Sequence, residues 1–173
     1  HGKGWIYGYV HNYGSSNPVS GDLDLYRADP AAVAADPGRA GLKVFGVFPE
    51  GLHRNAVVSD YLYGLAWGHG ERGLPDWLAR YTRARYGHSS PELVAAWLDV
   101  VRGAYATRYW TPRWWRSTAG AYLLCKRPDI AMADFEGAPG KRGALRAGVT
   151  RMAALAPGLA GSPLFRNDLV DLT

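Results

Sequence analysis

Two short apolar runs with a helical pattern between them constrain the fold of this chain most. They cover residues 5–10 and 42–48, and each has the length and the flanking Gly residues of a buried strand. A short helix is predicted around residues 22–35, so the order is strand, helix, strand. Because such a unit builds a parallel sheet, we expect the two strands to be parallel neighbours whose carboxyl ends share one edge.

From residue 55 onwards, every periodic pattern is helical. Asn55 is placed to cap the first of these helices, and a Gly-rich joint follows it at residues 68–73. Later helices are expected to begin at Pro75, Ser90-Pro91 and Ser162-Pro163, with another over residues 145–155. The predicted fold class is therefore α/β followed by all-α. We expect one domain at residues 1–68 and a second at residues 74–173.

The composition is that of a globular protein and excludes several classes. The chain has 173 residues, of which 47% are hydrophobic and 20% charged. Its lone Cys125 excludes an intramolecular disulfide and a cysteine zinc site, and we expect no metal. No apolar run reaches the roughly 20 residues that cross a membrane. The net charge is +5, but Lys and Arg are scattered along the sequence, so we expect no nucleic-acid partner and no membrane partner.

Both ends of the sequence interrupt a predicted element. The first strand begins almost at once, without an initiator Met, and the helix that starts at Ser162 stops at Thr173. We therefore expect the chain to be an internal piece of a longer protein.

The second apolar run ends abruptly in Pro49-Glu50-Gly51. The carboxyl edge of the strands is where α/β barrels hold their catalytic groups, so Glu50 is the first candidate for chemistry. A single Glu beside a turn is also typical of a solvated loop. The residues alone leave both interpretations open.

Several motifs follow one another in a fixed order along nearly the whole chain. They are His11-Asn12-Tyr13-Gly14; Pro49-Glu50-Gly51 followed by Asn55 and Val57-Val58; Trp77, Tyr81 and Arg85-Tyr86-Gly87; Arg127-Pro128; and FRNDLVDLT at residues 165–173. In this order and spacing they resemble the α-N-acetylglucosaminidases of glycoside hydrolase family 89. The resemblance implies that residues 1–68 are the C-terminal part of a (β/α)8 barrel, with two parallel strands. The rest would be the first part of an all-α domain.

The resemblance also implies roles for particular residues. Glu50 matches the catalytic nucleophile of the family, whereas the acid/base Glu lies on an earlier barrel strand that has no counterpart in this chain. His11 and Asn12 match a pair that lines the sugar pocket, although on the residues alone they can equally cap a turn. Val10 can touch the pocket wall or be buried in the barrel. The sequence departs from the family at residues 14–18, in the loop that faces the sugar.

The implied activity is the release of terminal α-linked N-acetylglucosamine from a glycan by a retaining double displacement, without metal or cofactor. The alternative is a catalytically inactive carbohydrate-binding remnant, since the acid/base residue is missing. Residues 109–116 are rich in Trp and Arg and can stack on a sugar ring or anchor a loop against the barrel. The family implies a secreted, periplasmic or lysosomal location.

Overall fold

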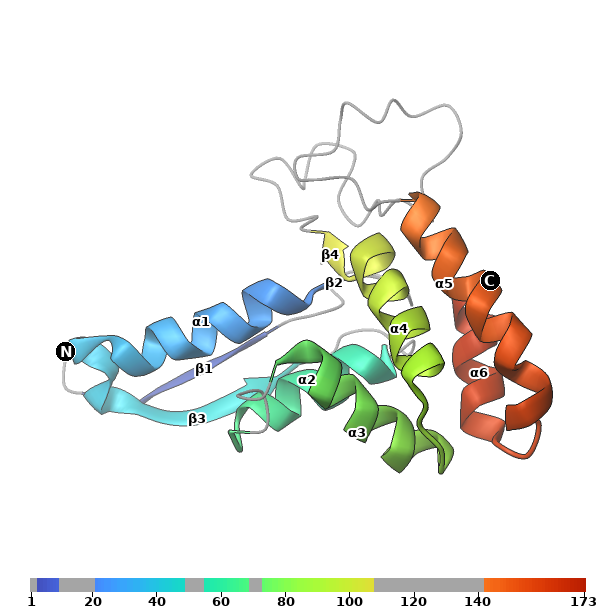
Figure 1. Cartoon of the computed structure of the whole chain (residues 1–173). Helices are drawn as coiled ribbons and strands as arrows, with labels where there is room; N and C mark the ends of the chain where they lie inside the picture. Colours follow the sequence, from blue (N-terminus) through green and yellow to red (C-terminus); the bar gives the residue numbers. More distant parts are fainter. Residues whose placement is uncertain (1–2, 10–20, 49–54, 69–72, 108–141) are drawn as a thin grey trace.

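The structure is a computed structural model and describes residues 3–9, 21–48, 55–68, 73–107 and 142–173. An arm built from two strands and one helix extends from a group of helices (Figure 1). The arm contains β1 (Trp5–Tyr9), α1 (Leu23–Ala35), the 3-10 helix η1 (Pro37–Gly41) and β3 (Leu42–Val47). These elements give the strand, helix, strand order predicted from the apolar runs.

The strands β1 and β3 pair in parallel, which confirms the predicted pairing. The register sets Ile6 opposite Val44 and Tyr9 opposite Val47. The α1 crossover between them begins at Asp22, whose carboxylate oxygen accepts a hydrogen bond from the Leu25 N–H at 2.9 Å and so caps the first turn. Parallel pairing thus follows from a connection long enough to hold a helix.

The two faces of the strand pair differ in their environment. On the face toward α1, the ring of Tyr9 meets the ring of Tyr26 edge to face, with centroids 4.9 Å apart. Ile6, Val44 and Phe48 belong to the other face by strand alternation and are 58%, 49% and 50% exposed. Only one face of the pair is therefore covered by the described part of the chain.

The described residues from Asn55 onwards contain five α-helices. These are α2 (Ala56–Leu65), α3 (Leu74–Tyr86), α4 (Pro91–Ala104), α5 (Arg142–Leu155) and α6 (Pro163–Leu172), with the 3-10 helix η5 (Ala156–Leu159) between the last two. Two short strands, β2 (Gly21–Asp22) and β4 (Ala106–Thr107), pair antiparallel and join the start of α1 to the end of α4. The sequence patterns did not predict this pair.

The helix ends follow the predicted capping signals with one exception. Ser90 and Ser162 accept hydrogen bonds from the third residue after them, and Gly87 ends α3 with a φ of 74°, which favours glycine. Asn55 occupies the N-cap position of α2, but its side chain makes no capping bond. The predicted N-cap position of Asn55 is confirmed, but the predicted capping hydrogen bond from its side chain is absent.

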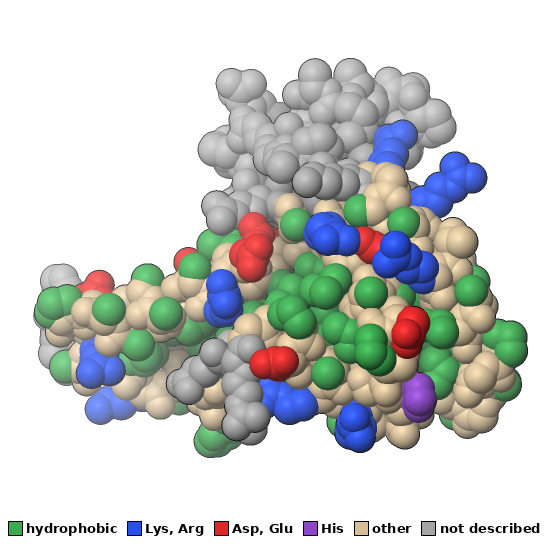
Figure 2. Space-filling model, viewed as in Figure 1, with side chains coloured by type: hydrophobic (Ala, Val, Ile, Leu, Met, Phe, Trp, Pro, Cys, Tyr) green, Lys and Arg blue, Asp and Glu red, His purple; other side chains and the backbone are tan. Residues whose placement is uncertain are grey.

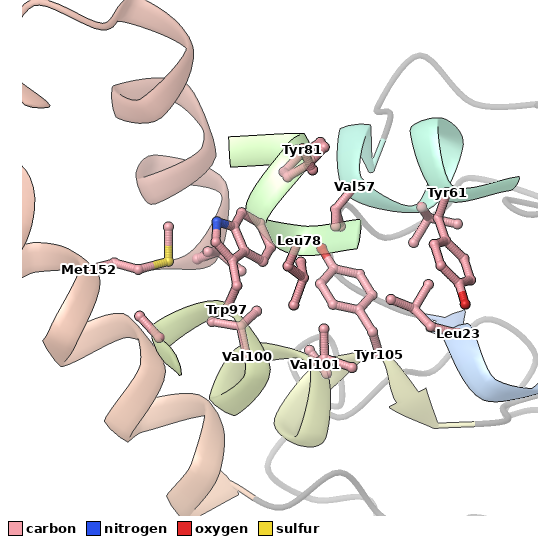
Figure 3. Close-up of a cluster of buried hydrophobic side chains, with 14 of the residues drawn as sticks. Leu23, Val57, Tyr61, Leu78, Tyr81, Trp97, Val100, Val101, Tyr105 and Met152 are labelled. Carbon is pink, nitrogen blue, oxygen red and sulfur yellow. The ribbon is translucent and has the colours of Figure 1, made fainter. Parts of the chain in front are cut away.

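One buried core joins α1 to the helices. Figure 3 shows the Tyr105 ring between Leu23 of α1 and Leu78 of α3, with Trp97 and Met152 further into the helical part. Leu78 and Met152 are fully buried, as the 3.6-residue periodicity of their helices predicts. Within the described ranges, none of the helices combines the length and the hydropathy that crossing a bilayer requires.

Candidate active-site edge

The carboxyl ends of both strands lie at the same edge of the sheet. The Phe48 N–H donates a hydrogen bond to the Tyr9 carbonyl oxygen at 2.8 Å, so the pairing continues to the last described residue of each strand. Val10 follows Tyr9 directly, and Glu50 comes two residues after Phe48. Two chain segments, residues 10–20 and 49–54, therefore leave the sheet at one edge.

The predicted site residues lie within these two segments. Val10, His11, Asn12 and Glu50 are all outside the described residues, as are residues 109–116. The structure does describe the residues on either side of segments 10–20 and 49–54, which are Tyr9 and Gly21 for the first and Phe48 and Asn55 for the second.

The first of the two segments ends at β2. Gly21 has a φ of 145°, and it pairs with Thr107 in the short β2–β4 ladder. The Leu23 N–H then donates to the Tyr105 carbonyl oxygen at 3.0 Å. The residues that follow segment 10–20 are therefore bonded to the residues just after α4.

The second segment ends at a buried polar contact with the same part of α4. The Tyr105 hydroxyl donates a hydrogen bond to Oδ1 of Asn55 at 3.0 Å, and both residues are buried. Burial raises the pKa of the Tyr105 hydroxyl, and the nearby Asp168 and Asp171 carboxylates add to that shift. The hydroxyl therefore stays protonated and able to donate throughout the physiological pH range.

A second buried polar group fastens α6 to α3. Asp168 accepts two hydrogen bonds from the Arg85 guanidinium, from Nε and Nη2 at 2.6 Å each. It also accepts from the hydroxyls of Tyr86 at 2.6 Å and of Tyr81 at 3.3 Å. Trp77 stacks on the Tyr81 ring at a centroid distance of 5.0 Å. Two motifs far apart in the sequence, at residues 77–87 and 165–173, thus form one contact.

Neither Tyr105 nor Asp168 was predicted from the sequence to have a functional role. Asp168 could have been noticed, because it falls between Phe165 and Leu172 on the buried face of α6, where a charged residue needs a partner. Tyr105 follows the inward positions of α4 and looks like any other aromatic core residue. Its contact with Asn55, 50 residues earlier, has no local signal.

A cavity of about 530 Å³ lies at the amino ends of β1 and β3, away from the candidate site, and is lined by Trp5, Gly41, Lys43 and neighbouring residues. Since parallel barrels carry their active sites at the carboxyl ends of the strands, we do not place the chemistry there. In the part of the chain that the structure describes, no group of His, Cys, Asp and Glu side chains could hold a metal ion. Lys and Arg side chains spread over the arm and the helices (Figure 2).

The described fold belongs to the α/β and all-α classes. A parallel strand, helix, strand unit of the kind that builds α/β barrels is followed by a group of packed helices. Residues 1–69 match the family model of the α-N-acetylglucosaminidase (NAGLU) tim-barrel domain, and residues 77–173 match that of the NAGLU C-terminal domain. The chain belongs to the α-N-acetylglucosaminidase family.

Individual relatives agree with this assignment. The chain is 29% identical over 175 residues to the α-N-acetylglucosaminidase of Homo sapiens, covering 99% of this chain and 22% of that protein. It is similar in structure to a family 89 glycoside hydrolase from Clostridium perfringens in complex with 2-acetamido-1,2-dideoxynojirmycin. The TM-score is 0.72 and the identity 20%, covering 97% of this chain and 19% of the other.

The same fold is found in a variant of the Clostridium perfringens enzyme in which two Glu residues are replaced by Gln. That variant is in complex with its substrate GlcNAc-α-1,4-galactose, and it matches with a TM-score of 0.70 at 20% identity. The chain spans about a fifth of the length of these relatives.

Proposed function

We propose that the full-length protein containing this chain is an exo-glycoside hydrolase that releases terminal α-linked N-acetylglucosamine from glycans. The observation that carries the proposal is the parallel strand pair in a chain of the NAGLU family. Its carboxyl edge leads into Val10, His11 and Asn12 on one side and Glu50 on the other. Residues 1–68 would form the end of the barrel and residues 74–173 the first part of the all-α domain.

The proposed mechanism is a retaining double displacement with Glu50 as the nucleophile. Its ionised carboxylate attacks the anomeric carbon, while an acid from an earlier barrel strand protonates the leaving oxygen. Water then hydrolyses the glycosyl-enzyme, and the same acid acts as the base. The Clostridium perfringens enzyme supports a pair of carboxylates, since the form bound to substrate has two Glu residues replaced by Gln.

The other predicted residues would bind the sugar rather than react with it. His11 and Asn12 would donate or accept hydrogen bonds from ring hydroxyls, and Val10 would form part of the pocket wall. The mechanism requires no metal and no cofactor. Membership of this family supports the proposal of a secreted, periplasmic or lysosomal location.

The test is the hydrolysis of an aryl α-N-acetylglucosaminide by the full-length protein and its Glu50→Gln variant. Gln keeps the size of the side chain and removes the attacking charge, so we expect turnover to fall on the order of 10⁴-fold or more. His11→Ala should cost less, because other contacts also hold the sugar. Added azide should rescue a Glu50→Ala variant but not His11→Ala, because the shortened side chain leaves room for the anion to attack the anomeric carbon, displace the aryl group and form a glycosyl azide.

Two outcomes would count against the proposal. Retention of more than about a tenth of wild-type turnover by Glu50→Gln would match an ordinary surface substitution, and Glu50 would then not be the nucleophile. A folded wild-type protein that binds the sugar without hydrolysing it would favour the inactive carbohydrate-binding alternative.

A further inference from the structure

Three consecutive residues directly after α4 contact the first described residues that follow the two segments leaving the strand edge. Tyr105 accepts the Leu23 N–H at its carbonyl oxygen and donates its hydroxyl to Asn55, at 3.0 Å in each case. Ala106 and Thr107 pair with the two residues of β2. We call residues 105–107 the α4 anchor. One end of each segment is thus fixed by the strand pair and the other by the α4 anchor.

We propose that the α4 anchor positions the catalytic edge, and that Tyr105 is a positioning residue for the Glu50 segment through its bond to Asn55. This inference rests on the proposed function, because it assigns Glu50 as the nucleophile. Asn55 lies five residues after Glu50. A bond that fixes Asn55 therefore fixes where the short Glu50 segment must end, and Phe48 fixes where it begins.

The use of the Asn55 side chain supports positioning. An Asn at a helix N-cap ordinarily accepts a backbone N–H of the first turn, a bond worth about 1 kcal/mol. In this structure its oxygen instead accepts the Tyr105 hydroxyl, and the capping bond of α2 is absent. A local helix contact is thus replaced by one between the barrel part and the helical part.

The other partner of the bond is held rigidly. Tyr105 is 3% exposed, and its own N–H donates to the Val101 carbonyl oxygen at 2.9 Å, which continues the hydrogen bonding of α4. Its ring packs between Leu23 and Leu78 (Figure 3). Groups that position a reacting side chain must have locked rotamers of their own, and Tyr105 meets this condition.

The test compares Tyr105→Phe with Thr82→Val in the full-length protein. Phe keeps the ring and removes only the hydroxyl that holds Asn55. Thr82 is the matched control, because its fully buried hydroxyl bonds the Leu78 carbonyl and the Ser89 hydroxyl at 2.9 Å each, within the α3–α4 region. Both variants lose one buried hydroxyl, so a similar loss of stability is expected from each.

Catalysis should separate the two variants. For Tyr105→Phe we expect kcat, per folded protein measured by circular dichroism, to fall about 10- to 100-fold with KM nearly unchanged. For Thr82→Val we expect kcat within about twofold of wild type. Combining Tyr105→Phe with Asn55→Ala should lower kcat no further than the more damaging single change, because both act on one bond.

Three outcomes would contradict the inference, and they differ in what they imply for the proposed function. If Glu50→Gln is inactive while Tyr105→Phe keeps wild-type kcat, this inference is wrong and the proposed function stands. If Tyr105→Phe and Thr82→Val lose kcat equally, the effect is one of general stability, and the inference is again wrong. If Glu50→Gln remains active, the proposed function fails, and the inference fails with it.

Discussion

Asp168 shows how one carboxylate can hold two helices together. A buried charge is costly unless it is paired and hydrogen-bonded, and Asp168 is 6% exposed. Arg85 supplies the opposite charge in a two-bond fork, and the hydroxyls of Tyr81 and Tyr86 add two more donors. Burial raises the pKa of both phenols, so they remain donors. The carboxylate is thus fully compensated by residues of α3.

Replacing Asp168 with Asn should weaken the α3–α6 contact strongly. The amide keeps the size but removes the charge and turns an N–H2 toward the donors of Arg85. Breaking a buried pair in this way costs about 3–5 kcal/mol. Asp171→Asn is the control, because Asp171 is exposed on the same helix, and a change within about 0.5 kcal/mol is expected. Urea unfolding followed by tryptophan fluorescence would measure both, and equal midpoints would contradict the prediction.

At this scale, the sequence offers a candidate residue for the chemistry but does not indicate the buried contacts. A carboxylate after an apolar strand makes Glu50 that candidate, because barrel geometry brings strand ends together, and its role stays a prediction. The partners of Asp168 lie more than 80 residues away, and no local pattern selects Arg85 over the other arginines of the helices. Such pairs depend on the angle at which helices pack, which sequence periodicity does not determine.

Among the elements, α4 and α5 pack most closely. Gly148 of α5 faces the backbone of α4, and a Cβ at this position would lie 2.8 Å from the Ala96 carbonyl oxygen and 2.8 Å from the Val100 nitrogen. Gly103 of α4 similarly faces Leu145. Glycine destabilises a helix by about 1 kcal/mol relative to alanine, so its use here is explained by the approach of the two backbones.

Gly148→Ala should therefore destabilise the protein despite the better helix propensity of alanine. The overlap is with backbone atoms, which cannot rotate away, and overpacking of this kind costs about 1–3 kcal/mol. Gly143→Ala is the control in the same helix, since no described atom lies within 4 Å of its Cβ position. That variant should be neutral or up to about 1 kcal/mol more stable. Thermal melting of both variants checks this, and a Gly148→Ala melting temperature at or above that of Gly143→Ala would refute it.

The sequence predicted the long elements well and the short ones poorly. The helices containing Tyr81, Trp97 and Met152 show a periodic apolar face, which is a local property of the chain. The β2–β4 pair has two residues in each strand, too few for any period, and it forms because α1 and α4 bring those residues together. The α4 anchor contains β4 and is therefore among the short elements that the sequence did not predict.

At the scale of the whole molecule, one face of the strand pair is apolar and is not covered by any described residue. Ile6, Val44 and Phe48 lie on the strand face opposite α1 and are about half exposed or more. Among the described residues neither β1 nor β3 has a second strand neighbour, so both are edge strands with open hydrogen-bonding groups. In a barrel, the neighbouring strands would cover both the face and the edges. The described residues after the strands also carry exposed apolar side chains, among them Trp67 at 79% and Val170 at 72%, but α1 to α6 enclose a buried core.

The 173-residue chain expressed alone should therefore expose an apolar patch and either aggregate or unfold at low denaturant. Bare strand edges pair with other chains, and an uncovered apolar face adds a driving force for association. We expect binding of the dye ANS and concentration-dependent assembly in sedimentation velocity. Changing Ile6 and Val44 to Thr should reduce both, because Thr keeps the β-branched shape while its hydroxyl makes the face more polar. A sharp cooperative melt of the unmodified chain at high temperature, with no assembly, would show that the exposed strand face is stable without barrel neighbours.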